Sequence, residues 1–154
     1  MLHEVRGGVI WNDPNAQIIF NPVSVSKSPE GQNIFNSNLK HDHHEVYDMY
    51  RDYMKGESKK RLLGDIQLVQ IEDKKFIMNG FVYYDNILNP KALMKAFVEL
   101  SNLIEEYHIA AAIPFRVGCK DTCMYQYIEE IINIVFGDCK SDIYIYKKKQ
   151  RNRN

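Results

Sequence analysis

The chain has 154 residues, the length of one ordinary domain, and its 45% hydrophobic and 26% charged residues are typical of a globular protein. Lys and Arg together number 20, as do Asp and Glu, so the zero net charge gives no electrostatic attraction to DNA or an acidic membrane surface. No apolar run could span a bilayer and no signal-peptide core is visible, so we expect a cytoplasmic protein with no membrane partner.

The cysteines point to a reducing compartment. Cys119, Cys123 and Cys139 are an odd number in a chain without an export signal, which favours free thiols. The Cys-x3-Cys spacing has no second Cys or His pair near it, so we expect neither a structural metal nor any cofactor. Residues 1–147 are expected to form the domain and the basic segment 148–154 a disordered tail, the alternative being a weak contact with RNA or phosphate.

Predicted strands and helices alternate along the chain, which indicates an α/β layered fold. The first half holds a β-prone stretch, a short apolar run typical of a strand buried on both faces, a long polar loop and a helix with one apolar stripe. In chain order these are a strand over 4–11 broken at Gly7-Gly8, a strand over 17–20 that ends at Asn21-Pro22, a loop over 24–38 and a helix over 45–55.

The second half gives clearer signals. A strand pair flanks the polar turn 72–74. Asn89 is a good N-cap, and Pro90 suits the first position of the helix that follows. In chain order we expect strands over 64–71 and 75–83, a helix over 90–107, a strand over 109–113, a loop over 115–121, a helix over 122–136 and a strand over 142–147.

Two loops follow buried apolar strands, at 21–34 and 114–121. Ligands of open α/β sheets bind at the carboxyl ends of strands, where the strand order switches. These two loops are therefore where we expect a functional site.

Several segments, taken together and in order, resemble a macro domain, in particular the branch of terminal ADP-ribose protein glycohydrolases and related phage and bacterial proteins. The most specific is Ile113-Pro114-Phe115-Arg116-Val117-Gly118-Cys119, which is similar to the family's M-P-x-x-I-G-C-G. Val5 to Val9 resembles V-K-G-D-I/L, and Ile18 to Ser24 resembles I-V-N-x-x-N/S. The resemblance implies a three-layer α/β/α sandwich on a mixed central sheet, with a cleft in which two loops of backbone N–H donors hold the diphosphate of ADP-ribose.

The resemblance also implies the site residues. Asn21 and Ser24 match polar positions that reach the distal ribose; alternatively they cap turns beside Pro22. Asp121 matches an acid/base residue of ester cleavage; alternatively it caps the following helix, and the two roles are compatible. The full set of implied ligand-binding residues is Gly8, Val9, Asn21, Ser24, Gly31, Gln32, Asn33, Ile34, Phe115, Val117, Gly118, Cys119 and Lys120.

The sequence departs from the family pattern at several points. Gly8 stands where an acidic residue bonds the adenine amine, and only Gly31 and Ile34 remain of the first loop's G-x-G-I-A. Lys120 replaces a glycine and adds a positive charge beside the phosphates. The stretch 80–86 contains no lysine, so the lysyl-intermediate chemistry of the branch is expected to be absent.

Other residues have a plainer interpretation beside the functional one. His41, His43 and His44 fit a solvated helix entry better than a shared metal, since neighbours on a helix diverge. Tyr83 and Tyr84 are suited either to stacking on a base or ribose or to an ordinary strand face.

Two functions stay open. One is a binding module that captures ADP-ribose or a related nucleotide, for instance a phage-type protein that sequesters a signal. The other is a hydrolase that removes ADP-ribose from an ADP-ribosylated protein or nucleic acid, or cleaves an ADP-ribose ester or phosphate.

Overall fold

The computed structural model describes residues 1–25, 39–55 and 59–147. Within these residues, seven strands form one mixed sheet in the order β1-β7-β6-β2-β4-β3, with β5 paired to β4. Strands β1, β7, β6, β2 and β4 run parallel, while β3 and β5 run antiparallel to β4. The strands are β1 Leu2–Arg6, β2 Ile18–Ser24, β3 Ile66–Glu72, β4 Lys75–Tyr84, β5 Ile87–Leu88, β6 Ala111–Pro114 and β7 Ile143–Lys147.

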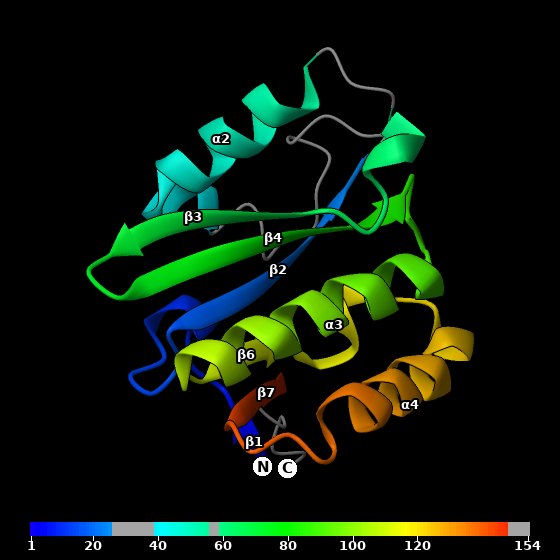
Figure 1. Cartoon of the computed structure of the whole chain (residues 1–154). Helices are drawn as coiled ribbons and strands as arrows, with labels where there is room; N and C mark the ends of the chain where they lie inside the picture. The colour runs from blue at the N-terminus through cyan, green and yellow to red at the C-terminus, as the bar shows by residue number, and fades with distance from the viewer. Residues whose placement is uncertain (26–38, 56–58, 148–154) are drawn as a thin grey trace, which may run out of the picture.

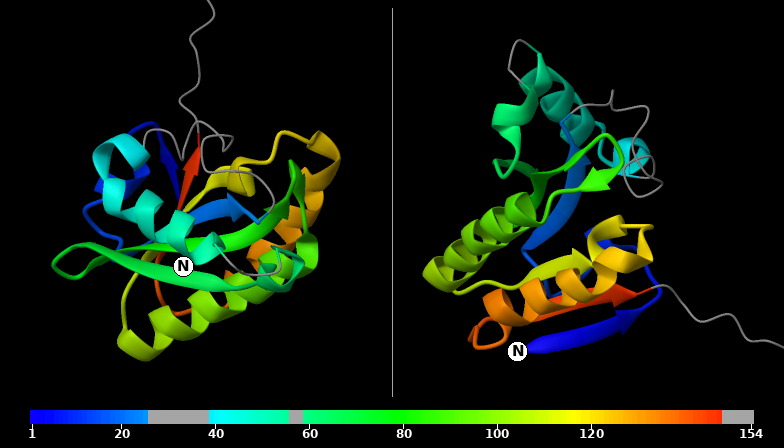
Figure 2. Two further views of the ribbon diagram at one scale, coloured as in Figure 1. Left: turned by 90° about the horizontal axis from the view of Figure 1, so that it is seen from above. Right: turned by 90° about the vertical axis from the view of Figure 1, so that its right-hand side faces the viewer.

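Helices cover both faces of the sheet, which confirms the predicted three layers. Figure 1 shows α2 on one face and α3 with α4 on the other, and Figure 2 shows β1 and β7 side by side at one edge. The described α-helices are α2 His44–Met54, α3 Pro90–Tyr107 and α4 Tyr125–Phe136, and the short 3₁₀ turns are η1 Ile10–Asn12, η3 Lys59–Leu62, η4 Phe115–Gly118 and η5 Thr122–Met124.

The larger core lies between the sheet and the α3–α4 layer. Phe97 of α3 packs edge-on against Phe20 of β2 at 5.0 Å and against Phe136 of α4 at 5.2 Å, so one ring joins all three elements. Gly80 of β4 is required here because a Cβ at this position would lie 2.4 Å from the Phe20 ring. On the opposite face, Val46 of α2 packs with Ile19 and its neighbours in a second core.

Several predicted boundaries were wrong in informative ways. The predicted break at Gly7-Gly8 is confirmed, because these residues adopt φ of 79° and 83° and turn the chain, but the strand begins at Leu2 and residues 10–12 form the 3₁₀ turn η1 instead of more strand. The second strand continues past Asn21 to Ser24. Among the described strands only β4 pairs with β2 at Pro22, so the missing N–H of the proline interrupts no second described ladder. The last helix begins as the 3₁₀ turn η5, and β5 was not predicted.

Candidate functional site

The described pairing between β2 and β6 ends before their carboxyl ends, and we call the unpaired part of the two strands, beyond Ile19 and Ala112, the gap. Within the described strands, β2 pairs with β6 only at Ile18–Ala111 and Ile19–Ala112, whereas it pairs with β4 along its whole length. The chain leaves β2 toward β3 and β4 on one side and leaves β6 toward β7 on the other. The gap is therefore a topological switch point, the place where parallel sheets bind ligands.

The loop after β6 has a strained backbone. Arg116 and Val117 have φ of 56° and 45°, and Gly118 follows with φ of 74°. A left-handed conformation costs a non-glycine residue about 1–3 kcal/mol and is a clear outlier for β-branched valine. Consecutive residues in such a turn direct backbone N–H groups to one side, and proteins use this arrangement to bind anions.

Two contacts hold this loop in place. The Val117 side chain is fully buried, and its carbonyl accepts a 2.9 Å hydrogen bond from the Tyr83 hydroxyl of β4. Burial raises the pKa of Tyr83, so its phenol stays protonated and donates. Tyr83 is thus a support for the loop, a role that strand periodicity could not reveal. The ring lies in the core between sheet and helices, which fits the strand-face alternative for Tyr83 and not stacking on a base or ribose.

The loop after β2 is described only at its start. Ser24 is 3% exposed and its hydroxyl donates to the Asp85 carbonyl at 3.4 Å, while the Val25 N–H donates to the Tyr83 carbonyl at 2.9 Å. Ser24 and Val25 therefore tie the end of β2 to β4. Four of the expected ligand-binding residues, Gly31, Gln32, Asn33 and Ile34, lie outside the described residues.

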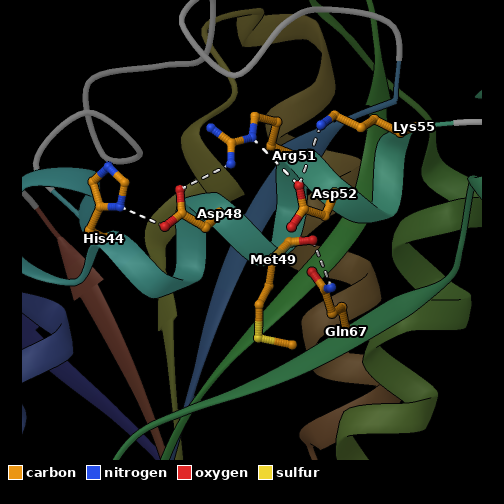
Figure 3. Close-up of polar contacts among 7 residues, drawn as sticks. All are labelled: His44, Asp48, Met49, Arg51, Asp52, Lys55 and Gln67. Carbon is orange, nitrogen blue, oxygen red and sulfur yellow. Dashed lines mark hydrogen bonds and ion pairs between the residues drawn. The ribbon is translucent and has the colours of Figure 1, made fainter.

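Asn21 does not cap a turn, contrary to one of its two predicted roles. It lies inside β2 and is 2% exposed. Its Nδ2 donates to Oδ1 of Asn79 at 2.8 Å, Nδ2 of Asn79 donates to Oε1 of Gln67 at 3.1 Å, and Nε2 of Gln67 donates to the Met49 carbonyl at 3.1 Å. The last of these contacts is drawn in Figure 3. The Asn21 Oδ1 atom is buried and has no hydrogen-bond partner among the described residues.

The turn after β1 leaves open space beside Gly8. A Cβ added to Gly8 would meet no atom of the described residues within 4 Å, and the positive φ favours glycine there. Val9 is 45% exposed. The Gly7 N–H donates to the Lys147 carbonyl at 3.1 Å, which fixes this turn to the end of β7. Gly8 and Val9 thus lie at the same carboxyl edge of the sheet as the two loops.

The end of the second loop combines exposed charges with a buried thiol. Lys120 and Asp121 are exposed and Cys119 is buried. Asp121 Oδ1 accepts from the Cys123 N–H at 3.0 Å, so the predicted capping role is present. The Cys119 N–H donates to the Arg116 carbonyl at 2.8 Å and closes the strained turn.

A stack of cations and rings, not anticipated from the sequence, lies beside this loop. The Phe115 ring has the Lys147 ammonium at 4.3 Å and the Arg116 guanidinium at 4.4 Å, and Arg116 also lies 3.6 Å from the Tyr125 ring centre. Lys147 also pairs with Glu4, and this hydrogen bond lowers the pKa of the Glu4 carboxyl. Phe115 is therefore engaged by its own chain, and Arg116 is held by stacking.

The histidines at the start of α2 face separate carboxylates. His41 lies 3.1 Å from Asp42, His43 3.5 Å from Glu45, and His44 2.7 Å from Asp48. Figure 3 shows His44 and Asp48 beginning a row of ion pairs that continues through Arg51 and Asp52 to Lys55 along α2. Within the described ranges no three His, Cys, Asp or Glu side chains are grouped as metal ligands, and no helix there could cross a membrane.

Comparison with known proteins places this geometry in a recognised fold. The sequence matches no family model and no curated protein. The structure is similar to a macrodomain protein from Streptomyces coelicolor (16% identity, TM-score 0.78, covering 96% of this chain and 99% of that one). It is also similar to the macrodomain of Thermus aquaticus DarG (15% identity, TM-score 0.75, covering 96% and 98%).

A third similar structure contains a ligand. It is Thermosipho africanus DarTG in complex with ADP-ribose, with 16% identity and a TM-score of 0.75. The match covers 99% of this chain but 43% of that longer one. These likenesses confirm the expected fold: the chain is folded as a macrodomain.

Proposed function

We propose that this macrodomain-fold chain binds ADP-ribose, or a closely related nucleotide, in the gap between β2 and β6. The observation that carries the proposal is the strained turn at Arg116 and Val117, which follows β6 and is restrained by the hydrogen bond from Tyr83. A protein tolerates such strain when the geometry serves a purpose, and backbone donors next to a switch point suit a diphosphate. The ADP-ribose complex of the similar Thermosipho africanus structure supports the same ligand class.

The ligand-binding residues that we assign lie around the gap at the carboxyl edge. Val117, Gly118 and Lys120 are proposed to offer backbone N–H groups, and Lys120 also a cation, to the phosphates. Cys119 closes the turn through its N–H and lines the same loop. Asn21 and Ser24 lie on the carboxyl half of β2. Phe115 and the 31–34 segment belong to the same proposed set, as do Gly8 and Val9 at the turn after β1. The free cysteines favour the reducing conditions of the cytoplasm.

Isothermal titration calorimetry with ADP-ribose, ADP and AMP tests the binding function. We expect saturable heat with ADP-ribose, weaker heat with ADP and the weakest with AMP, because each truncation removes contacts. The absence of heat with ADP-ribose at millimolar concentration would refute the proposal.

Turnover is the second candidate, and the exposure of Asp121 favours it. In the described part of the chain Asp121 is an exposed residue, and only its Oδ1 takes part in the cap. Asp121→Asn separates the two roles, because asparagine caps as well as aspartate but cannot transfer a proton at neutral pH. For a binder, release of ADP-ribose from modified protein or nucleic acid is equally slow in wild type and Asp121→Asn. Loss of release in Asp121→Asn, with binding retained, selects the hydrolase.

A further inference from the structure

Three carboxamide side chains form a continuous row across the sheet. Asn79 of β4 is the register partner of both Asn21 on β2 and Gln67 on β3, so the three residues are direct cross-strand neighbours on one face. The hydrogen bonds between them run 2.8 Å and 3.1 Å, and the row ends 3.1 Å from the Met49 carbonyl of α2. Asn21 lies next to the gap, and Met49 lies at the far end, on the helix layer.

The hydrogen bonds of this row can run in only one donor-to-acceptor direction. A main-chain carbonyl accepts and cannot donate, so Gln67 must turn its NH₂ to Met49 and its oxygen to Asn79. Asn79 must then donate to Gln67 and present its oxygen to Asn21, which donates in turn. The Met49 carbonyl thereby determines that the Asn21 amide contributes its NH₂, and not its oxygen, to the row.

The direction of the row determines where the Asn21 Oδ1 atom lies. The nitrogen of this amide is committed to Asn79, so the oxygen is turned away from β4, at the part of β2 where pairing with β6 has ended. Asn21 and Asn79 are 2% and 0% exposed, and Asn21 Oδ1 has no hydrogen-bond partner in the described ranges. A buried acceptor without a partner is costly, and a ligand donor would satisfy it.

We infer that Gln67 and Asn79 are positioning residues that hold Asn21 with its amide oxygen toward the ligand. This inference rests on the proposed function. The site then takes a hydrogen-bond donor at this point, such as a sugar hydroxyl. It rejects an ionised phosphate oxygen, which can only accept. The distinction orients a ligand that carries both kinds of group.

Two charged variants of Gln67 test the inference with a matched pair. In Gln67→Glu the carboxylate still accepts from Asn79, so the row keeps its direction. In Gln67→Lys the ammonium only donates, so Asn79 turns over and Asn21 presents its NH₂ to the gap. Gln67 is half-buried on the edge strand β3, so both variants are expected to fold, and thermal unfolding verifies this.

The binding readout compares ADP-ribose with ADP, which lacks the distal ribose hydroxyls. Gln67→Lys is expected to weaken ADP-ribose binding about five- to tenfold, the loss of one hydrogen bond, and ADP binding less than twofold. Gln67→Glu is expected to stay within about twofold of wild type for both ligands. Simple Coulomb attraction predicts the opposite order, since lysine would strengthen binding of an anion. Equal ADP-ribose affinity in wild type and Gln67→Lys would overturn the inference.

A second readout needs no ligand. The Asn21 side-chain NH₂ resonances, identified by their loss in Asn21→Asp, should exchange slowly with solvent in wild type and Gln67→Glu. In Gln67→Lys they should exchange at least tenfold faster, because the NH₂ leaves the row. Unchanged exchange in Gln67→Lys would overturn the inference even if ADP-ribose does not bind. Faster exchange without any binding would instead refute the proposed function alone.

Discussion

Removing the Tyr83 hydroxyl tests whether the strained second loop depends on its contact with β4. In Tyr83→Phe the ring keeps its place in the core, but the Val117 carbonyl loses its 2.9 Å hydrogen bond. An acceptor left unsatisfied in a buried position costs about 1–3 kcal/mol. The turn at Arg116 and Val117 stores strain of about 1–3 kcal/mol per residue, so loss of the restraint also lets the loop relax.

Relaxation recovers part of the lost stability and removes part of the ligand site. We therefore expect unfolding free energy to fall by about 1–2 kcal/mol, near the lower end of the desolvation range. For a chain of this size that corresponds to a drop in Tm of roughly 2–8 °C. ADP-ribose affinity should also fall, although the variant stays folded, because the backbone N–H donors of the loop are no longer held in place.

Urea unfolding and calorimetric titration measure the two effects, and Tyr107→Phe serves as the matched control. Tyr107 is 63% exposed on α3, so the same chemical change there should alter stability by less than about 0.5 kcal/mol. If Tyr83→Phe is as stable as Tyr107→Phe and the amide resonances of residues 115–119 do not move, the hydrogen bond to Val117 does not restrain the loop and the reasoning is wrong.

Two further variants address the ligand site directly. Lys120→Glu should weaken nucleotide binding about three- to tenfold, as expected for reversing one exposed charge beside a diphosphate. Lys140→Glu makes the same charge change just before β7, at the amino end of the parallel strands, and should have no comparable effect. Equal nucleotide affinities of the two variants would exclude Lys120 from the phosphate site. Gly8→Asp should cost about 1 kcal/mol of stability because of its φ of 83°, while the described residues leave room for its Cβ. Tighter AMP binding in this variant would show that an acid at position 8 can bind the adenine amine in this chain, and unchanged AMP binding would refute that role.

Local sequence signals located most of the elements. The helix over 90–107 was predicted at its observed bounds because its cap is local: the Asn89 side chain accepts from the Ala92 N–H at 3.0 Å, with Pro90 in the first turn. The apolar strands were located well in their centres, since buried runs of β-branched residues are distinctive. Their ends were less certain: the predicted end at Asn21-Pro22 was wrong, because β2 continues through the proline to Ser24.

The site was predicted less completely than the fold. The motif at 113–119 pointed to the second loop, and Asp121 was expected to cap the turn that it does cap. The sequence did not reveal that Tyr83 supports Val117, or that Phe115 and Arg116 stack with Lys147 and Tyr125. These partners are separated by many residues along the chain, and no local pattern links them.

The alternation of strands and helices and the apolar periodicity of each element determined, without any coordinates, that this chain forms a layered α/β domain. They did so because the spacing of apolar residues that marks the buried face of a helix or strand can be read within a short stretch of sequence. Only the tertiary structure decided that Asn79 falls in register between Asn21 and Gln67, and that β2 and β6 separate beyond Ile19. Strand register and strand order depend on how distant segments pack, and the chemistry of the gap follows from both.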